Sequence, residues 1–516
     1  MARKIAIIGG GIAGLSAGCY GRMNGYETEI FEMHNVPGGV CTGWTRKGYT
    51  FDGCLHFLVG TAPGSSMYRL WDELGGLAGT RVYNHEVFCD IVLPSGKRLS
   101  QYSDVDRLVA HLKESVAPSA HDMKMLDQLA SDTRLWIGLS GRMGSAKPPS
   151  QKPGIRGFLA RLRGMWKMRA YIPTFKRFGV SIEQYAARYR HPDLRAFFEL
   201  ALPIPGMPAM ILLNLISVQH EKQAGWPEGG SLALARAVEK RYMDLGGVVH
   251  YGAQVEEIIV RDGRAVGVRL MDGTDHYVDE VISAADGRAT LFGMLKGRYM
   301  TPALEEVYKT LPLYKPLVQV SYGLNRHIPL SELPRLRTIR PAVPADIGGE
   351  PVPFLMVNNY SFDPTMAPSG KTALTVLYQS PWESWEGLQD NRKAYVARKA
   401  RILSDMTAWL EKSLPGISAD IEATDVATPL TTVHFTGNYH ASFEGWRPTL
   451  ATMRMNIEKR IPGLSHFAMI GQWTRPAAGL PTVAEDGRII IEELCAQDGR
   501  PFVTTKPAAE EKEGAA

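Results

Sequence analysis

The segment that most constrains the fold is KIAIIGGGIAGLSAG, residues 4–18. Residues 5–8 are all apolar and predict a short buried strand, and residues 12–23 predict a helix. The turn between them carries the pattern G-x-G-x-x-G, formed by Gly9, Gly11 and Gly14. A glycine turn between a strand and a helix is typical of the α/β folds that bind dinucleotides.

Each glycine has a physical role in such a turn. The first allows the sharp bend, the second lets a pyrophosphate approach the backbone, and the third lets the helix pack close to the strand. The helix begins at the phosphates with free N–H groups and a partial positive charge. A second strand is predicted over residues 27–31, and Glu32 follows it about 20 residues past the loop, where ribose hydroxyls need an acceptor. The carboxylate disfavours a 2′-phosphate, so we expect NAD or FAD rather than NADP.

The composition is that of an ordinary globular protein. Of the 516 residues, 45% are hydrophobic and 22% are charged, and this length predicts two or three subdomains. The net charge of +5 gives no reason to expect a nucleic-acid partner. The five cysteines are scattered without a C-x-x-C pair, so we expect reduced thiols, no metal site and no disulfide framework. No signal-peptide pattern precedes the first strand, and we expect a cytoplasmic protein.

The middle of the chain predicts elements of other layers. Residues 81–103 predict a hairpin with a turn at Ser95-Gly96, and residues 104–135 predict a helix. From Trp226 the pattern is a helix and then several strands, ending over residues 280–283, where the chain returns to the first domain. The last helix is expected from about Val483.

The dinucleotide fold is therefore predicted to be discontinuous, with the substrate part inserted between its pieces. Large flavoproteins need this arrangement, because the flavin extends away from the ADP and a late segment must cover it. The expected dinucleotide-binding parts are residues 1–80, 226–295 and 451–503, the substrate and lid parts are 81–225 and 296–450, and residues 504–516 are expected to be a disordered tail.

Two segments of the lid part have unusual compositions. Residues 141–180 are rich in Lys, Arg and aromatic residues and hold no Asp or Glu, which favours either contact with an anionic membrane surface or a solvated basic face. Residues 197–218 are strongly apolar, but Pro203, Pro205 and Pro208 would break a membrane-spanning helix. We expect buried helices around an apolar pocket there.

Four segments occur in order along nearly the whole chain. They are IIGGGIAGLSAG with Glu32, PGGVCTGWTRKGYTFDGCLHFLVG, PEGGSLALARAVEKRYMDLGGVVHYGAQVEEI and GQWTRPAAGLPTVAEDGR. Together they resemble the phytoene desaturase and carotenoid isomerase branch of the FAD-dependent amine oxidase superfamily. The resemblance implies an α/β fold: a Rossmann-type FAD-binding domain with an inserted mixed α+β substrate domain and a helical, membrane-contacting subdomain. It also implies FAD as the cofactor and an apolar tunnel that ends at the flavin.

The resemblance assigns cofactor roles by position. The glycine pair 38–39 would let a loop pass the flavin, Val255 would contact adenine through its backbone, and the last helix would present N–H groups to the flavin ring. This chain differs from many relatives at Gln472, where they have an acid, and at Val40, where they have Arg. The predicted cofactor contacts are Gly9, Gly11, Ile12, Ala13, Gly14, Glu32, Met33, Gly38, Gly39, Val40, Val255, Gly471, Gln472, Thr482 and Val483.

Few catalytic side chains are expected, because a flavin carries the hydride chemistry and a polyene offers no polar handle. The candidates for a polar role are His56, Glu228, His434 and Trp473. The favoured interpretation of His56 is a hydrogen-bonded core histidine, and Glu228 is equally interpretable as an acid at a helix start. Trp473 is also interpretable as a packing residue.

The sequence therefore predicts an FAD-dependent oxidoreductase for a long apolar isoprenoid, which it would desaturate, saturate or isomerise. The alternatives are an amine oxidase of the same fold and a flavin-bearing escort protein. The sequence holds no second G-x-G-x-x-G for a nicotinamide, which leaves oxygen, a quinone or a protein as the electron partner.

Overall fold

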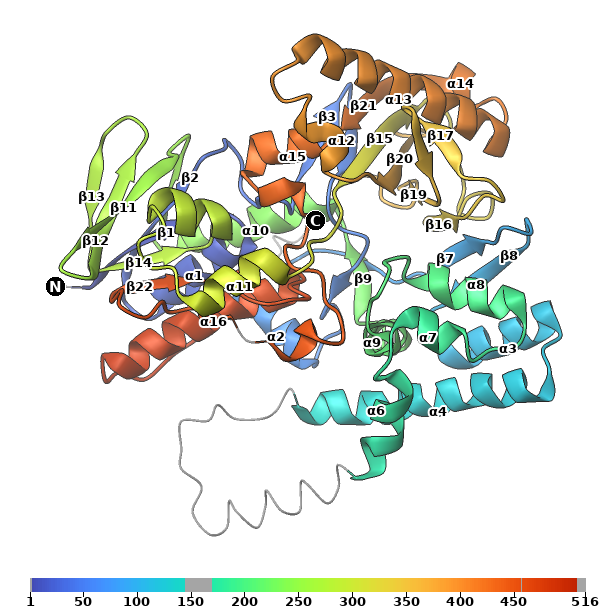
Figure 1. The fold of residues 1–516 in the computed structure, drawn as a ribbon, viewed down its shortest axis with the longest axis horizontal. Helices are drawn as coiled ribbons and strands as arrows, with labels where there is room; N and C mark the ends of the chain where they lie inside the picture. Colours follow the sequence, from blue (N-terminus) through green and yellow to red (C-terminus); the bar gives the residue numbers. More distant parts are fainter. Residues whose placement is uncertain (1, 144–168, 456, 508–516) are drawn as a thin grey trace, which may run out of the picture.

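The computed structural model describes residues 2–143, 169–455 and 457–507, and a five-stranded parallel sheet organises one half of it (Figure 1). In spatial order its strands are β10 (Val248–Tyr251), β2 (Glu27–Glu32), β1 (Lys4–Ile8), β14 (Glu280–Ser283) and β22 (Phe467–Met469). Three distant parts of the chain thus form one sheet. Strands β1, β14 and β22 are largely buried, as is typical of the central strands of parallel sheets covered on both faces.

Three helices pack together beside this sheet. The central one is α1 (Ile12–Met23), which contacts both α10 (Gly230–Asp244) and α16 (Leu480–Gln497). Helices α1 and α16 approach closely because Gly487 faces α1; a Cβ at Gly487 would lie 2.5 Å from the backbone nitrogen of Ala17. The predicted first strand and helix are confirmed as β1 and α1.

A small antiparallel sheet belongs to the same half of the molecule. It comprises β11 (Val255–Arg261), β12 (Arg264–Leu270) and β13 (Asp275–Tyr277). The turn after β11 uses Asp262 and Gly263 with φ of 48° and 70°, the left-handed conformation that Gly and Asp tolerate best.

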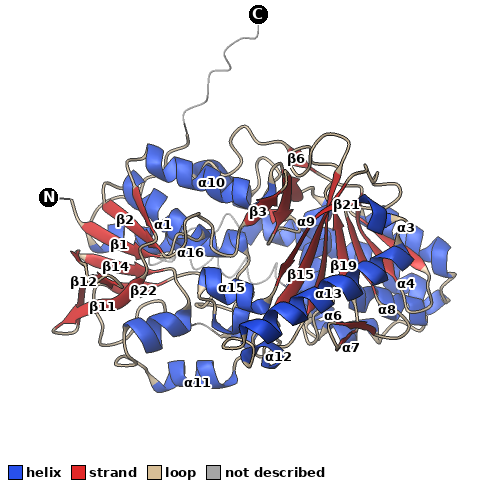
Figure 2. Cartoon of the chain, turned by 90° about the horizontal axis from the view of Figure 1, so that it is seen from above, coloured by secondary structure: helices blue, strands red, loops and turns tan. Residues whose placement is uncertain are grey.

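A seven-stranded mixed sheet organises the other half of the molecule (Figure 2). The predicted hairpin at residues 81–103 is confirmed as β7 and β8 at its edge, and α13 (Arg392–Ser413) covers one face. In spatial order the strands are β21 (Ile421–Ala427), β15 (Leu317–Leu324), β20 (Thr372–Gln379), β19 (Leu355–Asn359), β16 (Leu336–Ile339), β7 (Val87–Val92) and β8 (Arg98–Tyr102).

Helices of the lid part pack against the β7–β8 end of this sheet around one hydrophobic cluster. Residues 104–135, predicted to be helical, lie in two helices, because Ala117 takes a left-handed conformation and Pro118 follows it. The apolar segment 197–218 forms two helices separated at its prolines, as predicted. The layer comprises α3 (Val105–Val116), α4 (Ala120–Met143), α6 (Ile172–Phe178), α7 (Ile182–Ala186), α8 (Pro192–Ala201) and α9 (Ala209–His220).

Short elements connect these layers. They are β3 (Gly43–Arg46), β4 (Tyr49–Asp52), β5 (Leu58–Val59), α2 (Ser66–Glu73), β6 (Val82–Tyr83), η1 (Arg169–Tyr171), β9 (Ala224–Pro227), η2 (Ala289–Met294), α11 (Pro302–Thr310), β17 (Ala345–Ile347), β18 (Glu350–Val352), α12 (Glu383–Glu386), α14 (Ile417–Asp420), α15 (Pro429–Thr436), η3 (Tyr439–Ala441) and η4 (Thr452–Arg454).

The expectation of a disordered tail needs correction, and parts of the tail and of the basic segment lie outside the described residues. The tail expected to be disordered from residue 504 is fixed at its start: Arg241 donates to Thr505 Oγ1 at 2.8 Å, and Lys506 pairs with Asp72. Most of the basic segment, residues 144–168, and the end of the tail, residues 508–516, lie outside the described residues. Where the structure describes the chain, no helix is both long and apolar enough to cross a membrane.

Candidate cofactor and substrate site

One cavity of about 530 Å³ lies between the parallel sheet and the seven-stranded sheet. At one end it is lined by the glycine turn after β1 and by the ends of β2 and β11. At the other end its wall is mostly apolar, with Gln319, Gln379 and Tyr360 beside the apolar residues Leu202, Ile204, Leu317, Phe354, Met356 and Leu377. Polar groups for a nucleotide and apolar groups for a hydrocarbon therefore face the same space.

The glycine turn has the geometry that a bound pyrophosphate requires. Gly9 has a φ of 99°, and a Cβ at Gly14 would lie 2.0 Å from the carbonyl oxygen of Gly9, so Gly14 fixes the helix against the turn. Gly14 itself does not line the cavity, whereas Gly9 and Gly11 do. Gly11 is the N-cap of α1 and supplies no side-chain cap, which leaves the first helical N–H groups free of a side-chain partner.

Glu32 is fixed at the cavity wall by backbone donors. Its two carboxylate oxygens accept from the N–H groups of Gly10 at 2.6 Å and His34 at 2.8 Å. Each carboxylate oxygen has more than one lone pair, so Glu32 can still accept from the hydroxyls of a ribose. This position is compatible with the role predicted from its spacing.

The late motif GQWTR is folded around a buried carboxylate. Asp486 of α16 accepts from Lys459 Nζ at 2.7 Å, from Thr474 Oγ1 at 3.0 Å and from Arg475. It also accepts from the backbone N–H of Gly471 at 3.3 Å. Asp486 therefore sets the position of the loop that lines the cavity, a role that we did not predict from the sequence.

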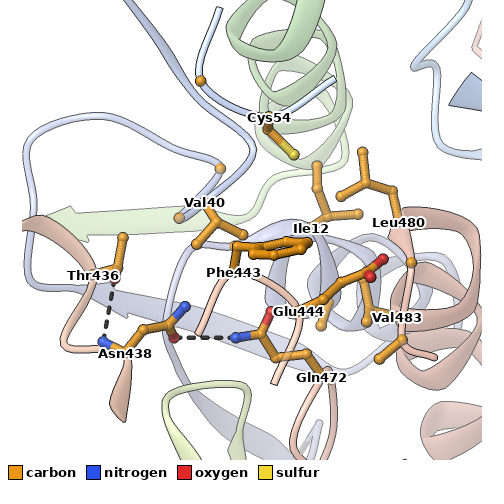
Figure 3. A pocket seen from close by; sticks show the side chains of 18 of the residues that line it. Ile12, Val40, Cys54, Thr436, Asn438, Phe443, Glu444, Gln472, Leu480 and Val483 are labelled. Carbon is orange, nitrogen blue, oxygen red and sulfur yellow. Dashed lines mark hydrogen bonds between the residues drawn. The ribbon is translucent and has the colours of Figure 1, made fainter. Parts of the chain in front are cut away.

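Gln472 and Trp473 of this loop both line the cavity. Figure 3 shows Gln472 Nε2 donating to Asn438 Oδ1, at 3.2 Å. The indole of Trp473 packs edge-on against Trp446, and its Nε1 is buried without a hydrogen-bond partner among the described residues. A bound group with an acceptor would satisfy this donor.

The start of α16 differs from the prediction. The helix begins at Leu480 rather than Val483, since Pro481 is tolerated in the first turn. Val483 lines the cavity and Thr482 does not. The backbone N–H groups of both residues donate to Gly479 O, at 2.9 Å for Thr482 and 3.1 Å for Val483, and their place near a flavin ring stays a prediction.

The remaining predicted contacts gather on the same cavity. Its lining includes Ile12, Ala13, Met33, Gly38, Gly39, Val40, Val255 and Gly471. The glycine pair contacts the glycine turn directly, because the Gly38 N–H donates to Gly10 O at 2.9 Å. The site thus fits a dinucleotide: a tight glycine cradle, a helix start without a side-chain cap, a fixed carboxylate and, among the described residues, an unpaired indole N–H surround one space.

The four candidates for a polar role separate into two pairs. His56 and Trp473 line the cavity. Glu228 lies outside the lining and accepts from the Tyr83 hydroxyl at 2.6 Å, so it joins two segments rather than facing the cavity. His434 of α15 also lies outside the lining and packs edge-on against Phe435.

His56 is held neutral by its surroundings. Burial and then the positive charge of Arg335 lower the pKa of His56 to about 4. Arg335 also donates to the backbone carbonyl of His56. An imidazole in this state can donate one hydrogen bond and accept another, but it carries no charge at neutral pH.

This environment predicts a pH-dependent stability. Unfolded His56 takes up a proton below its ordinary pKa of 6.5, whereas the folded protein resists protonation until about pH 4. Stability should therefore fall as the pH falls between these values, by about 3 kcal/mol from this residue. Urea unfolding across this range should show a shallower fall in the free energy of unfolding for His56→Asn; an unchanged slope would contradict the assignment.

Two acids at the cavity were missed because nothing in their local sequence marks them. Asp286 accepts from the N–H groups of Ala289 at 2.8 Å and Tyr439 at 2.9 Å, and burial raises its pKa to about 6. Glu444 points into the cavity near Val483 (Figure 3), and burial raises its pKa despite a hydrogen bond from Tyr314. A carboxyl that stays protonated to higher pH can hold or deliver a proton there.

A strand, a glycine turn, a helix and an acid at the end of the next strand, all opening on one cavity, define a dinucleotide-binding protein of the Rossmann type. Residues 7–74 match the NAD(P)-binding Rossmann-like domain family.

Comparison with known proteins agrees over nearly the whole chain. The chain is 24% identical to a chloroplastic prolycopene isomerase of Arabidopsis thaliana, over 96% of this chain and 82% of that protein. It is 26% identical to a neurosporene-forming phytoene desaturase of Rhodobacter capsulatus, over 95% of this chain and 94% of that protein. The resemblance predicted from the four segments is confirmed.

Solved structures share the fold. An oxidoreductase from Methanosarcina mazei is similar with a TM-score of 0.58 and 18% identity, covering 95% of this chain and all of that one. Reduced UDP-galactopyranose mutase has a TM-score of 0.56 and 13% identity, covering 96% and 94%. The predicted α/β fold class is therefore confirmed.

Proposed function

We propose that this protein is an FAD-dependent oxidoreductase that acts on a long apolar isoprenoid of the polyene class. The observation that carries the proposal is a cavity that joins a dinucleotide cradle to a wall rich in leucine, isoleucine, phenylalanine and methionine side chains. The names of the relatives, carotenoid desaturases and isomerases, support the same class of substrate.

A bound flavin would supply the exchange of a hydride with a substrate carbon. The residues of the chain bind and orient both partners. Gly9 and Gly11 would admit the pyrophosphate, and Glu32 would accept from the ribose hydroxyls. The loop held by Asp486 would flank the cofactor, and the apolar wall would align the polyene and exclude water.

The apolar wall also weighs against an amine oxidase, which needs polar groups to hold an amine. On the substrate side, the described lining residues with ionisable side chains include His56, which is held neutral, and Glu444, whose pKa is raised. Desaturation, saturation and isomerisation all suit this environment. We infer that the electron partner is oxygen, a quinone or a protein, and that the protein is cytoplasmic.

The experiment that tests the proposal is an anaerobic visible spectrum of the purified protein with FAD. Adding detergent-dispersed phytoene should bleach the flavin band if the substrate gives up a hydride. If the band persists, pre-reduced protein incubated with a cis-polyene should yield an isomerised or saturated product. A protein that neither retains flavin nor alters any polyene would contradict the proposal.

We further propose that the lid helices contact an anionic membrane surface, from which a polyene would enter. Support comes from α6, which lies within the basic segment 141–180 and exposes Ile172 and Phe175 beside Lys176. Phe175→Glu should weaken binding to vesicles with phosphatidylserine about tenfold, because an aromatic ring is no longer buried in lipid. Val396→Glu, at an exposed position of α13, is the control in the same flotation assay; equal binding by all forms would contradict the proposal.

A further inference from the structure

A second cavity, of about 270 Å³, lies beside the cofactor and substrate cavity. Its wall is formed by the segment before β7, the segment after β8, the end of α9, strand β9 and the residue before β16. Arg335 connects the two cavities. It lines the second cavity, and its Nη1 donates to the backbone carbonyl of His56, which lines the first.

Arg335 is a buried cation without an acidic partner. The residue is 3% exposed, its Nη2 has no hydrogen-bond partner, and no carboxylate of the described residues forms an ion pair with it. Its guanidinium lies instead over the ring of Phe88, 5.2 Å from the ring centre. Burial lowers the pKa of Arg335 to about 10, so the side chain still carries its charge at neutral pH. An unpaired charge in the interior is costly, and a bound anion would compensate it.

Two further donors of the same cavity lack partners among the described residues. Gln219 is 3% exposed, and its Oε1 accepts from Gln101 Nε2 at 3.1 Å, which leaves its own Nε2 buried and unpaired. His85 Nε2 is also buried and unpaired. Burial and then the charge of Arg335 lower the pKa of His85 to about 3, so its imidazole is neutral and can donate one hydrogen bond. A guanidinium, an amide and an imidazole therefore line one space with donors to spare.

The distribution of charge favours a ligand with a single negative charge. Glu86, Asp104 and Lys222 also line the cavity, but they lie on its exposed side. The side chains of Glu86 and Asp104 are 68% and 54% exposed, so water and salt screen their charges. Arg335 is shielded from water, and it offers one positive charge at the buried end.

Apolar side chains complete the wall. Phe88, Ala224 and Trp226 line the cavity, and both aromatic residues are buried. An inorganic anion would leave these side chains without a partner, whereas the carbons of an organic acid would pack against them. A carboxylate also presents two acceptor oxygens, which can bind to two different donors.

We propose that this second cavity binds a short-chain carboxylate, whose oxygens accept from Arg335 and Gln219 and whose carbons pack against Phe88 and Trp226. The proposal goes beyond the proposed function and does not rest on it, because the cavity is separate from the one assigned to flavin and polyene. Since Arg335 also holds the carbonyl of His56, a bound carboxylate would fix this part of the substrate cavity's wall.

The test is isothermal titration calorimetry of the full-length protein with butyrate, in the presence of saturating FAD. We expect saturable binding of one butyrate per chain. Butyramide, the neutral analogue, should bind at least about tenfold more weakly, because a hydrogen bond to a charged group is worth about 1.5–3 kcal/mol. The same affinity is expected without FAD, so a failure of flavin binding would not be mistaken for a failure of this site.

Two variants locate the bound anion. Arg335→Met removes the positive charge and keeps an unbranched side chain. Gln219→Glu retains an acceptor for Gln101 and adds a negative charge to the cavity. Each should weaken the binding of butyrate at least about tenfold. Arg392→Met, the same change at an exposed position of α13, is the control and should bind butyrate as the unmodified protein does.

Unmodified protein that shows no saturable binding of butyrate would overturn the proposal, because water alone would then fill the cavity. Equal affinity for butyramide, tighter binding of inorganic phosphate, or unchanged affinity in a folded variant of Arg335 or Gln219 would also overturn it. Far-UV circular dichroism shows whether each variant is folded. If Arg335→Met is unfolded, Gln219→Glu decides the outcome, since it leaves the buried arginine in place.

Discussion

Glu32→Ala should abolish the retention of FAD through purification. The carboxylate is placed to accept from the ribose hydroxyls, and hydrogen bonds to a charged group are worth about 1.5–3 kcal/mol each. Loss of two such bonds should weaken binding at least about 100-fold. The substitution also leaves the N–H groups of Gly10 and His34 without their acceptor. Fluorescence titration of the protein with FAD measures the effect.

Two further variants separate the effect of the Glu32 charge from the effect of its position on β2. Glu32→Gln keeps an acceptor oxygen and should lose less affinity than Glu32→Ala. Glu29→Ala removes an acid of the same strand that is exposed and pairs with His250, and it should bind FAD as the unmodified protein does. Stoichiometric FAD in purified Glu32→Ala would show that the carboxylate does not hold the cofactor.

Asp486→Asn should destabilise the protein and, at the same time, weaken the attachment of the GQWTR loop, residues 471–475, to α16. The carboxylate is fully buried and is the shared partner of Lys459 and Arg475, which keep their charges when it is neutralised. Removing one partner of a buried ion pair costs about 3–5 kcal/mol. We expect about 3 kcal/mol, because both cations are partly exposed to solvent. Urea unfolding without added cofactor measures the loss.

The matched control is Glu485→Gln, the same chemical change one residue earlier in α16. It should alter the free energy of unfolding by less than about 0.5 kcal/mol. If Asp486→Asn proves as stable as this control, the Asp486 carboxylate does not stabilise the loop through Lys459 and Arg475.

Local patterns predicted the elements whose formation depends on neighbours in sequence. The strand, glycine turn and helix at residues 4–23, the acid after β2, and the two lid helices separated by prolines all follow from period, turn chemistry and helix breaking. Where a single residue changed the local outcome, prediction failed. The break at Ala117, in a left-handed conformation, lies inside the stretch predicted to be helical and was not foreseen, and Pro481 allows α16 to begin at Leu480, earlier than expected.

Groups brought together only by the folded chain could not be predicted from local sequence. Asp486 is 27 residues from Lys459 and 12 from Thr474, and only the packing of α16 brings these partners to one point. Glu444 and Asp286 gain their raised pKa values from burial, which no local pattern encodes. Glu228 was placed near the site by a motif, but its hydrogen bond to Tyr83 fixes it elsewhere.

The order of strands in the parallel sheet has a consequence for how the protein is made. Strand β1 leaves the ribosome first, but its neighbour β14 and then β22 are synthesised much later. Pairing over such separations in sequence is slow, and the apolar edge of β1 is prone to aggregate until β14 pairs with it. The cofactor cradle can therefore close only after β22 has been synthesised, so that a nascent chain needs protection of β1 until then.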